Sequence, residues 1–298
     1  MSFRLVKHLP NAVLSMGVSA LLAACGGGAT VAPGPTPAPG SMPAPGQRIT
    51  IGASTVLGMD AYQYPGDEAM RDWKAQSPYT WTGYYLAAPC HRDATWMGRR
   101  ASLERMGWGI APIFVGQQDW PKQDTAAAPT QPAAPDSSST PKPPPQCSAS
   151  LLTQERGTAD ADTALARAAR DGFPAGTTIF LDVERVAAVS PALETYVRAW
   201  LARVLADGRY RGGMYVHASN AQRLYDIAQS AYSARGLADR PRFWVATPAN
   251  FTRERSPADV GFPFADAWQG IIHQSETWGT HAITVDVSVS TPSFPSGT

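Results

Sequence analysis

Candidate strands and helices alternate along the chain from about residue 49, and this alternation is the feature that most restricts the possible folds. Each strand candidate is a short, mostly apolar run, and most are followed by a segment with helical spacing of apolar residues. Alternation of this kind predicts a parallel sheet, and eight strands predict its closure into a barrel. An open doubly wound sheet is the alternative. The eight candidates are T-V-L-G-M-D (55–60), W-T-G-Y-Y-L (81–86), G-I-A-P-I-F-V (109–115), T-I-F-L-D-V-E (178–184), G-M-Y-V (213–216), R-F-W-V-A (242–246), W-Q-G-I-I-H-Q (268–274) and A-I-T-V-D-V-S (282–288).

Five helices are predicted between these strands. The clearest begins at Ser190-Pro191, an N-cap followed by proline at the first helical position, and ends at Gly208. Little helix is predicted between the last three strands. We therefore expect a single α/β domain over residues 49–290, a (β/α)8 TIM-type barrel that is irregular and short of helices toward its C-terminus. The other four helices are predicted over about 67–76, 94–106, 161–172 and 220–235.

Proline and glycine are concentrated in segments outside this pattern. Residues 25–48 are predicted to form a Pro/Gly-rich disordered tether, and 121–147 a disordered insertion within the barrel. Residues 291–298 are expected to form a disordered tail. The strands on both sides of the insertion belong to one pattern, so the insertion is interpreted as a long loop rather than a domain boundary.

Residues 1–24 are predicted to be a lipoprotein signal peptide. A short positive end precedes an apolar run that is too short to span a bilayer comfortably, and the run ends in Leu22-Ala23-Ala24-Cys25-Gly26. This end resembles a bacterial lipobox, which implies cleavage before Cys25 and lipidation of that cysteine. An ordinary signal peptide with an incidental cysteine is the alternative. We expect an exported protein anchored by lipid to the cell envelope, and Gly26 after the cysteine favours an outer membrane facing the periplasm, with the cell surface as the other possibility.

Two further cysteines remain, Cys90 and Cys147. In an exported protein a disulfide between them is the default expectation. Cys90 follows one candidate strand and Cys147 closes the insertion after the next, so neighbouring loops at one end of the sheet could bring the two together. Their spacing matches no metal motif, so no metal site is predicted. No G-x-G-x-x-G or Walker loop occurs, and no cofactor is predicted. A net charge of +1 with 16% charged residues indicates no nucleic-acid partner, and a monomer is expected.

Acidic residues fall at or near the ends of three candidate strands. Asp60 ends the first, Asp182 and Glu184 lie in the fourth, and Asp286 lies late in the eighth. Positions i and i+2 of a strand share one face, so Asp182 and Glu184 point the same way. In a barrel the C-terminal strand ends meet at one mouth, where active sites of this fold are built. Pairing of Asp182 and Glu184 with arginines is the structural alternative.

Several strand motifs carry a resemblance to known proteins. The segments G-M-D-A-Y (58–62), F-L-D-V-E (180–184) and V-D-V-S (285–288), with H-Q-S (273–275), resemble in order the motifs of glycoside hydrolase family 25, the lysozyme-type enzymes. Three segments look typical of a bacterial glycoside-hydrolase-like family, domain-of-unknown-function family 1906: S-P-Y-T-W-T-G-Y-Y-L (77–86), G-W-G-I-A-P-I-F-V-G-Q-Q (107–118) and F-P-A-G-T-T-I-F-L-D-V-E (173–184). This is the closer similarity, and it covers about 52–289 without the Pro-rich insertion. The resemblance implies an incomplete (β/α)8 barrel.

The same resemblance implies roles for the four acids. Glu184 matches the general acid, Asp182 its partner on the strand, and Asp60 and Asp286 the flanking acids. The chain departs from the family at His273-Gln274-Ser275-Glu276, where lysozymes have Trp-Gln-Tyr-Ser, and at Ser288, where they have Asn.

The predicted function is cleavage of glycosidic bonds in peptidoglycan or a related envelope polysaccharide. A carboxylic acid would protonate the leaving oxygen while a carboxylate supports the positive charge that develops on the sugar. A non-catalytic module that binds glycan at the same barrel mouth is the alternative. The expected substrate-binding residues are Tyr62, Tyr84, Trp268 and Gln274.

Overall fold

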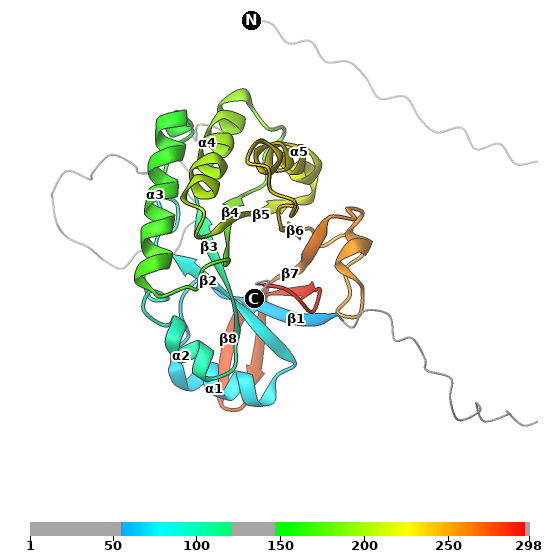
Figure 1. The fold of residues 1–298 in the computed structure, drawn as a ribbon. Coiled ribbons are helices and arrows are strands. Elements are labelled where there is room, and N and C mark those ends of the chain that lie inside the picture. Colours follow the sequence, from blue (N-terminus) through cyan, green and yellow to red (C-terminus); the bar gives the residue numbers. More distant parts are fainter. Residues whose placement is uncertain (1–54, 121–146, 296–298) are drawn as a thin grey trace, which may run out of the picture. The chain divides into compact units, whose positions relative to one another are not determined.

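The computed structural model describes residues 55–120 and 147–295, which form one closed barrel (Figure 1). The predicted signal peptide, Cys25, the tether and all of the insertion except Cys147 lie outside the described residues. Within the described part of the chain, no helix is long and apolar enough to cross a membrane.

Eight strands close the barrel in sequence order, as the alternation predicted. Strands β1 to β7 run parallel, but β8 is antiparallel to both of its neighbours, β7 and β1. The expectation of a wholly parallel sheet is therefore wrong at β8, because a tight turn and no helix join it to β7, and such a hairpin reverses the chain. The strands are β1 Val56–Asp60, β2 Tyr79–Leu86, β3 Gly109–Val115, β4 Thr178–Val183, β5 Arg211–His217, β6 Phe243–Ala246, β7 Ala265–Trp278 and β8 His281–Ser290.

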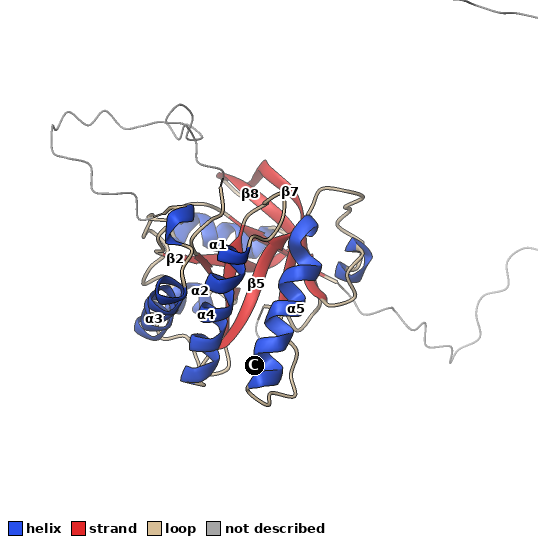
Figure 2. Ribbon diagram, turned by 90° about the horizontal axis from the view of Figure 1, so that it is seen from above, coloured by secondary structure: helices blue, strands red, loops and turns tan. Residues whose placement is uncertain are grey.

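The predicted helices are present with two clear changes in extent. The helix expected over 161–172 begins earlier, since α3 spans Gln154–Arg170. The helix expected over 94–106 is restricted to α2, and Gly98 with φ +81° lies in the turns before it. Helices α3, α4 and α5 pack in succession outside the strands (Figures 1 and 2). Only a short 3-10 helix, η2, lies between β6 and β7. The helices are α1 Asp67–Gln76, α2 Arg100–Arg105, η1 Ala149–Leu151, α3 Gln154–Arg170, α4 Pro191–Asp207, α5 Ala218–Ala234 and η2 Pro257–Val260.

Helix α4 shows how closely local sequence decides these elements. The Ser190 hydroxyl accepts a hydrogen bond from the Leu193 N–H, Pro191 occupies the first turn, and Gly208 ends the helix with φ +76°. Its apolar stripe, including Tyr196 and Trp200, is buried as core. The interpretation of these aromatic residues as packing rather than a ligand box is confirmed.

Aromatic side chains fill the end of the barrel away from the strand C-termini. Phe294 is 4% exposed and its ring packs against Trp81, Phe180 and Trp244, with centroids 4.6, 5.3 and 5.8 Å away. Residues 291–295 were expected to belong to a disordered tail, and that expectation is wrong because Phe294 is part of the core.

Candidate active site

A cleft of about 890 Å³ opens at the C-terminal ends of the parallel strands. The residues that line it come from every strand except β3, from the loops after β1 and β4, and from α1. The four acids named from the sequence, Asp60, Asp182, Glu184 and Asp286, all line this cleft. The prediction that they meet at one mouth is thus confirmed in geometry.

Asp286 reaches the mouth by a different route from the one expected. It lies in the middle of β8, and β8 runs in the opposite direction to β1. The antiparallel register pairs Asp286 with Asp60, the last residue of β1. A mid-strand residue of β8 therefore lies level with the C-terminal end of β1.

Gln269 of β7 links these two carboxylates. Its Nε2 donates to Asp60 Oδ2 at 3.1 Å and to Asp286 Oδ2 at 3.2 Å, and its Oε1 accepts from the Tyr215 hydroxyl at 2.6 Å. The second oxygen of Asp60 accepts from the Tyr85 hydroxyl at 2.7 Å. Asp60 is 2% exposed and Gln269 3%, so this network is a buried and well-connected floor of the cleft.

A glycine on the neighbouring strand provides the room for Asp60. A Cβ added at Gly83 would lie 2.6 Å from Asp60 Cβ and 2.9 Å from Ile113 Cδ1. Any larger residue at position 83 would displace the carboxylate from the cleft floor, since these separations are too short for carbon atoms in contact.

The backbone of β7 supplies a donor to the other acid. The His273 N–H donates to Asp286 Oδ1 at 2.7 Å. His273 has φ +54° and lies where the register of β7 against β8 shifts. A non-glycine residue in the left-handed region is unfavourable, and it is held here by the hairpin that surrounds it.

Burial raises the pKa of all four carboxyl groups. For Asp60 and Asp182 the pKa is well above its ordinary value, and after burial the charges of Asp286 on Asp60 and of Glu184 on Asp182 add to the shift. Burial also raises the pKa of Asp286, and the His273 N–H opposes that shift. The cleft therefore favours protonated or shared-proton states of these acids.

Glu184 has the direction of pKa shift expected of a proton donor. Its pKa is raised by burial in the cleft and partly lowered by the Trp120 indole, whose Nε1 donates to Glu184 Oε2 at 2.9 Å. Burial is therefore the cause of the raised pKa of Glu184. Glu184 follows the last residue of β4 and is exposed to the cleft, whereas Asp182 is 8% exposed.

The alternative of structural ion pairs finds no support at this pair. In the described ranges, neither Asp182 nor Glu184 forms an ion pair, and Arg99 and Arg253 pair with Asp67 and Glu276 instead. No described side chain donates a hydrogen bond to the Asp182 carboxylate. Its oxygens are therefore open to a partner that enters the cleft.

Only one of the four expected substrate-binding residues lines the cleft. Tyr62 does so and is 47% exposed. Trp268 and Tyr84 are fully buried, and they bond to the Thr247 carbonyl and the Asp171 carboxylate, respectively. Gln274 is exposed on β7 but is not part of the cleft lining. These three placements correct the sequence expectation.

The errors have identifiable causes. Side chains alternate along β2, so Tyr85 faces the acids while its neighbour Tyr84 faces the helices. The family's Trp-Gln motif was aligned with His273-Gln274, but the glutamine that contacts the acids is Gln269. The dipeptide Trp268-Gln269 itself was the available signal. Tyr215 was missed because its strand carries no acid to draw attention to it.

Three large apolar side chains remain exposed around the acids. In the described part of the chain they are Tyr62 at 47%, Trp120 at 42% and Ile272 at 61%. Tyr62 and Ile272 line the cleft, and Trp120 contacts Glu184. Exposed apolar surface gathered at one opening marks a binding region.

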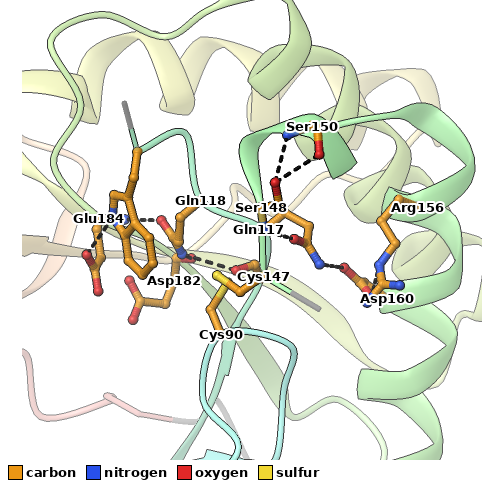
Figure 3. Close-up of a disulfide and its surroundings, with 12 residues drawn as sticks. Cys90, Gln117, Gln118, Cys147, Ser148, Ser150, Arg156, Asp160, Asp182 and Glu184 are labelled. Atoms are coloured by element: carbon orange, nitrogen blue, oxygen red, sulfur yellow. Dashed lines mark hydrogen bonds and ion pairs between the residues drawn. A yellow bond between two sulfur atoms is a disulfide. The ribbon is translucent and has the colours of Figure 1, made fainter. Parts of the chain in front are cut away.

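The two cysteines of the described residues are bonded to each other. Cys90 and Cys147 form the predicted disulfide, with Cα atoms 5.0 Å apart (Figure 3). Among the described residues, no group of three or more His, Cys, Asp or Glu side chains is arranged to hold a metal ion.

Glycoside hydrolases use a pair of carboxyl groups at the sugar, and this closed barrel gathers carboxyl groups at the C-terminal ends of its parallel strands. The sequence model of the family described as "Rv2525c-like, glycoside hydrolase-like domain" matches residues 71–290. The chain belongs to this family, and the family resemblance stated from the motifs is confirmed. No curated protein sequence matches the chain significantly.

Two solved structures with TM-scores of 0.52 and 0.50 share the fold at low sequence identity, and a third has a lower TM-score. An uncharacterized protein of B. stearothermophilus is 17% identical with a TM-score of 0.52, over 80% of this chain and 96% of that one. The spore cortex lytic enzyme SleM of Clostridium perfringens is 14% identical with a TM-score of 0.50, over 79% of this chain and 67% of that one. The Tat-secreted protein Rv2525c of Mycobacterium tuberculosis is 17% identical with a TM-score of 0.46, over 83% and 100%.

Proposed function

We propose that this protein is an exported, lipid-anchored glycoside hydrolase that cuts peptidoglycan or a related envelope polysaccharide. The observation that carries the proposal is the convergence of Asp60, Asp182, Glu184 and Asp286 on one cleft of about 890 Å³. Four carboxyl groups with raised pKa values are costly to a fold, and they are useful where a proton must be delivered and a positive charge stabilised.

Glu184 is the proposed general acid. It is the most open of the four groups, and burial keeps its pKa above the ordinary value, so it can hold a proton until a leaving oxygen takes it. The Gln118 side chain accepts from the Glu184 N–H at 2.9 Å, and the Trp120 indole donates to its carboxylate. These contacts orient the acid toward the bond to be cut.

Asp182 is the proposed partner that stabilises the reacting sugar. Its carboxylate lies deeper than Glu184 and accepts no hydrogen bond from a described side chain, so an acetamido N–H of an N-acetylated sugar would be a suitable donor. In that arrangement the acetamido oxygen attacks the anomeric carbon as the leaving oxygen takes the Glu184 proton. Water then opens the cyclic intermediate, with Glu184 as the base. Asp60 and Asp286, joined by Gln269, form the acidic floor beneath the sugar.

Lipid attachment at Cys25 and export remain proposals that rest on the lipobox-like sequence. Several acyl chains on one cysteine would hold the protein firmly at a membrane, which favours action on a glycan next to it. Metabolic labelling with a fatty acid tests this directly: the natural chain is expected to carry the label and a Cys25→Ser variant to lack it. A label that persists in the variant would contradict lipidation at Cys25.

The catalytic proposal is tested with the Cys25→Ser chain and purified peptidoglycan. Soluble fragments are expected from this protein and from a control that carries Glu155→Gln, an exposed acid at the start of α3. No fragments are expected from Glu184→Gln. Equal release by the control and by Glu184→Gln would remove Glu184 from the mechanism.

Binding without cleavage is the second candidate function. The exposed side chains Tyr62, Trp120 and Ile272 would grip a glycan whether or not the acids act on it. Co-sedimentation with peptidoglycan without release of fragments, by both the parent and Glu184→Gln, would support this module. A protein that neither binds nor cuts would contradict both candidates for this substrate.

A further inference from the structure

The Cys90–Cys147 disulfide joins two segments that each lead directly to the carboxyl groups (Figure 3). Cys90 lies in the turn after β2, and its N–H donates to the Val115 carbonyl at the end of β3. Cys147 is the last residue of the insertion, and it lies two residues before the start of η1. The two cysteines are 57 residues apart in sequence, so the bond fixes a contact that local structure does not provide.

The segment that follows Cys147 holds Gln117. The Ser148 N–H donates to Gln117 Oε1 at 2.9 Å, and Gln117 Nε2 donates to Asp160 Oδ2 at 3.4 Å (Figure 3). The Gln117 N–H donates to the Tyr196 hydroxyl at 3.1 Å. Gln117 is fully buried, so these contacts fix the backbone at the entry to residue 118.

Gln118 bridges to the loop that carries the two acids of β4. Its Oε1 accepts from the Glu184 N–H at 2.9 Å, and its Nε2 donates to the Asp182 carbonyl at 2.9 Å and the Gly116 carbonyl at 3.3 Å. Gln118 is 1% exposed. One buried amide thus holds the backbone on both sides of Val183, where β4 ends.

The segment that follows Cys90 leads to the opposite wall of the cleft. His91 is 2% exposed and its ring stacks on Tyr85 with centroids 4.4 Å apart at 19°. The Tyr85 hydroxyl donates to Asp60. A shift of this turn would therefore move the donor that Asp60 depends on.

We propose that the Cys90–Cys147 disulfide, together with Gln117 and Gln118, is a positioning unit that sets the orientation of Glu184 at the cleft. Gln118 is the positioning residue in contact with the acid's backbone, and the disulfide keeps the segments on both sides of it in place. The expected consequence of Glu184 leaving this orientation is loss of the burial that raises its pKa. The link to catalysis depends on the proposed function, but the orientation of Glu184 does not.

A purely stabilising disulfide would behave differently. Such a bond lowers the entropy of the unfolded chain and raises the melting temperature, but it leaves the environment of Glu184 in the folded protein unchanged. A positioning unit changes that environment while the barrel remains folded. The titration of Glu184 distinguishes the two, because it reports on the folded protein and requires no substrate.

The experiment is a carbon-13 NMR titration of the carboxyl groups in the Cys25→Ser chain, with the Glu184 signal assigned from its absence in Glu184→Gln. Gln118→Met removes the three hydrogen bonds at nearly constant volume, and Cys90→Ser with Cys147→Ser removes the disulfide. Gln222→Met is the matched control, since Gln222 donates to Asp226 on the exposed face of α5. The other acids of the cleft, Asp60, Asp182 and Asp286, are followed in the same spectra.

In Gln118→Met the pKa of Glu184 is expected to fall toward its ordinary value by about half a unit or more, and in Gln222→Met to remain as in the parent. The double cysteine variant is expected to change in the same direction. An unchanged Glu184 titration in Gln118→Met would overturn the proposal even if the melting temperature falls. If the pKa of Glu184 falls in Gln118→Met but is unchanged in the folded double cysteine variant, the disulfide has no part in positioning Glu184. If the double cysteine variant does not fold, the Glu184 titration in Gln118→Met alone tests the proposal.

Hydrolysis provides the second measurement. If the proposed function holds, Gln118→Met is expected to release peptidoglycan fragments on the order of tenfold more slowly than Gln222→Met. If the parent releases none, the proposed function fails while the titration still tests the positioning unit. The two failures are thus distinguishable.

Discussion

Asp60 and Asp286 are register partners in the antiparallel ladder of β1 and β8, and the amide of Gln269 donates to a carboxylate oxygen of each. Two like charges placed side by side and buried would repel strongly, and an amide nitrogen offers one N–H to each group. The same amide accepts from Tyr215. Gln269 is therefore the residue that makes this acid pair compatible with a folded barrel.

Substitution of Gln269 by leucine is expected to lower the free energy of unfolding at pH 7 by about 2–4 kcal/mol, because three buried hydrogen bonds are lost and their partners remain. Gln269 lowers the pKa values of Asp60 and Asp286, so its loss raises them further. The penalty should thus be larger at pH 7 than at pH 4, where these acids are closer to neutral. Urea unfolding at both pH values measures it. Gln222→Leu, an exposed glutamine, should change stability by no more than about 0.5 kcal/mol.

Substitution of Asp182 by asparagine is expected to stabilise the protein at pH 7. Burial raises the pKa of Asp182 in the folded state above the ordinary value of 3.8, so the folded state binds the proton more tightly than the unfolded chain. Stability is then lost as pH rises from 3.8 toward the folded pKa, and the asparagine variant avoids that loss. The gain should exceed about 1 kcal/mol at pH 7 and vanish below about pH 4.

Thermal unfolding over this pH range provides the test, with the surface variant Asp239→Asn as the control. If Asp182→Asn stabilises the protein equally at every pH, ionisation of the Asp182 carboxyl group is not the cause of the gain. A loss of stability at pH 7 would contradict the burial of an unpaired carboxyl group.

Substitution of Trp120 by phenylalanine is expected to raise the pKa of Glu184. The indole N–H bonds to the Glu184 carboxylate and lowers its pKa, and phenylalanine keeps the ring without that donor. If protonated Glu184 is the acid, the alkaline limb of the pH–rate profile should move upward by about half a unit to one unit. Trp278→Phe is the control, because Trp278 donates to Glu276 at 3.0 Å in the same manner outside the cleft lining. A downward shift of the alkaline limb in Trp120→Phe would contradict the assignment of Glu184 as the general acid.

Substitution of Phe294 by alanine is expected to cost about 3–5 kcal/mol of stability, as for other buried phenylalanines. The ring is 4% exposed and packs on Trp81, Phe180 and Trp244, so truncation leaves a cavity at the closed end of the barrel. Ile272→Ala, at a side chain 61% exposed, should change stability by about 0.5 kcal/mol or less. Chemical denaturation of both variants makes the comparison. Near-equal stabilities would show that residues 291–295 are not part of the core.

Local sequence patterns were sufficient for the elements and for the acids themselves. Helix α4 has its serine cap, its proline and its terminal glycine within one short segment, and these signals need no distant contact. Alternating apolar runs indicated the strands, and their number indicated the barrel. The acids were found because a charged residue at the end of an apolar strand is visible in the sequence.

The placement of polar partners needed the tertiary structure. Gln269 contacts Asp60 from a strand far away in sequence, and Tyr215 reaches the acid pair only through its hydrogen bond to Gln269. The Trp268-Gln269 dipeptide marks the glutamine, but no local pattern shows which side chains it contacts. The choice between Tyr84 and Tyr85 depends on which face of β2 points into the barrel. Because side chains alternate along a strand, an error of one residue assigns a buried core side chain to the cleft.

The direction of β8 shows the same division between local and global information. Its apolar alternation predicts a strand but carries no sign of direction, since side chains alternate in either orientation. Closure of the barrel through a hairpin decided that β8 runs antiparallel, and this direction sets Asp286 against Asp60. The sequence by itself determined the strands and the four acidic residues at or near their ends, and the tertiary structure decided how those residues meet, because burial and pairing are properties of the closed barrel.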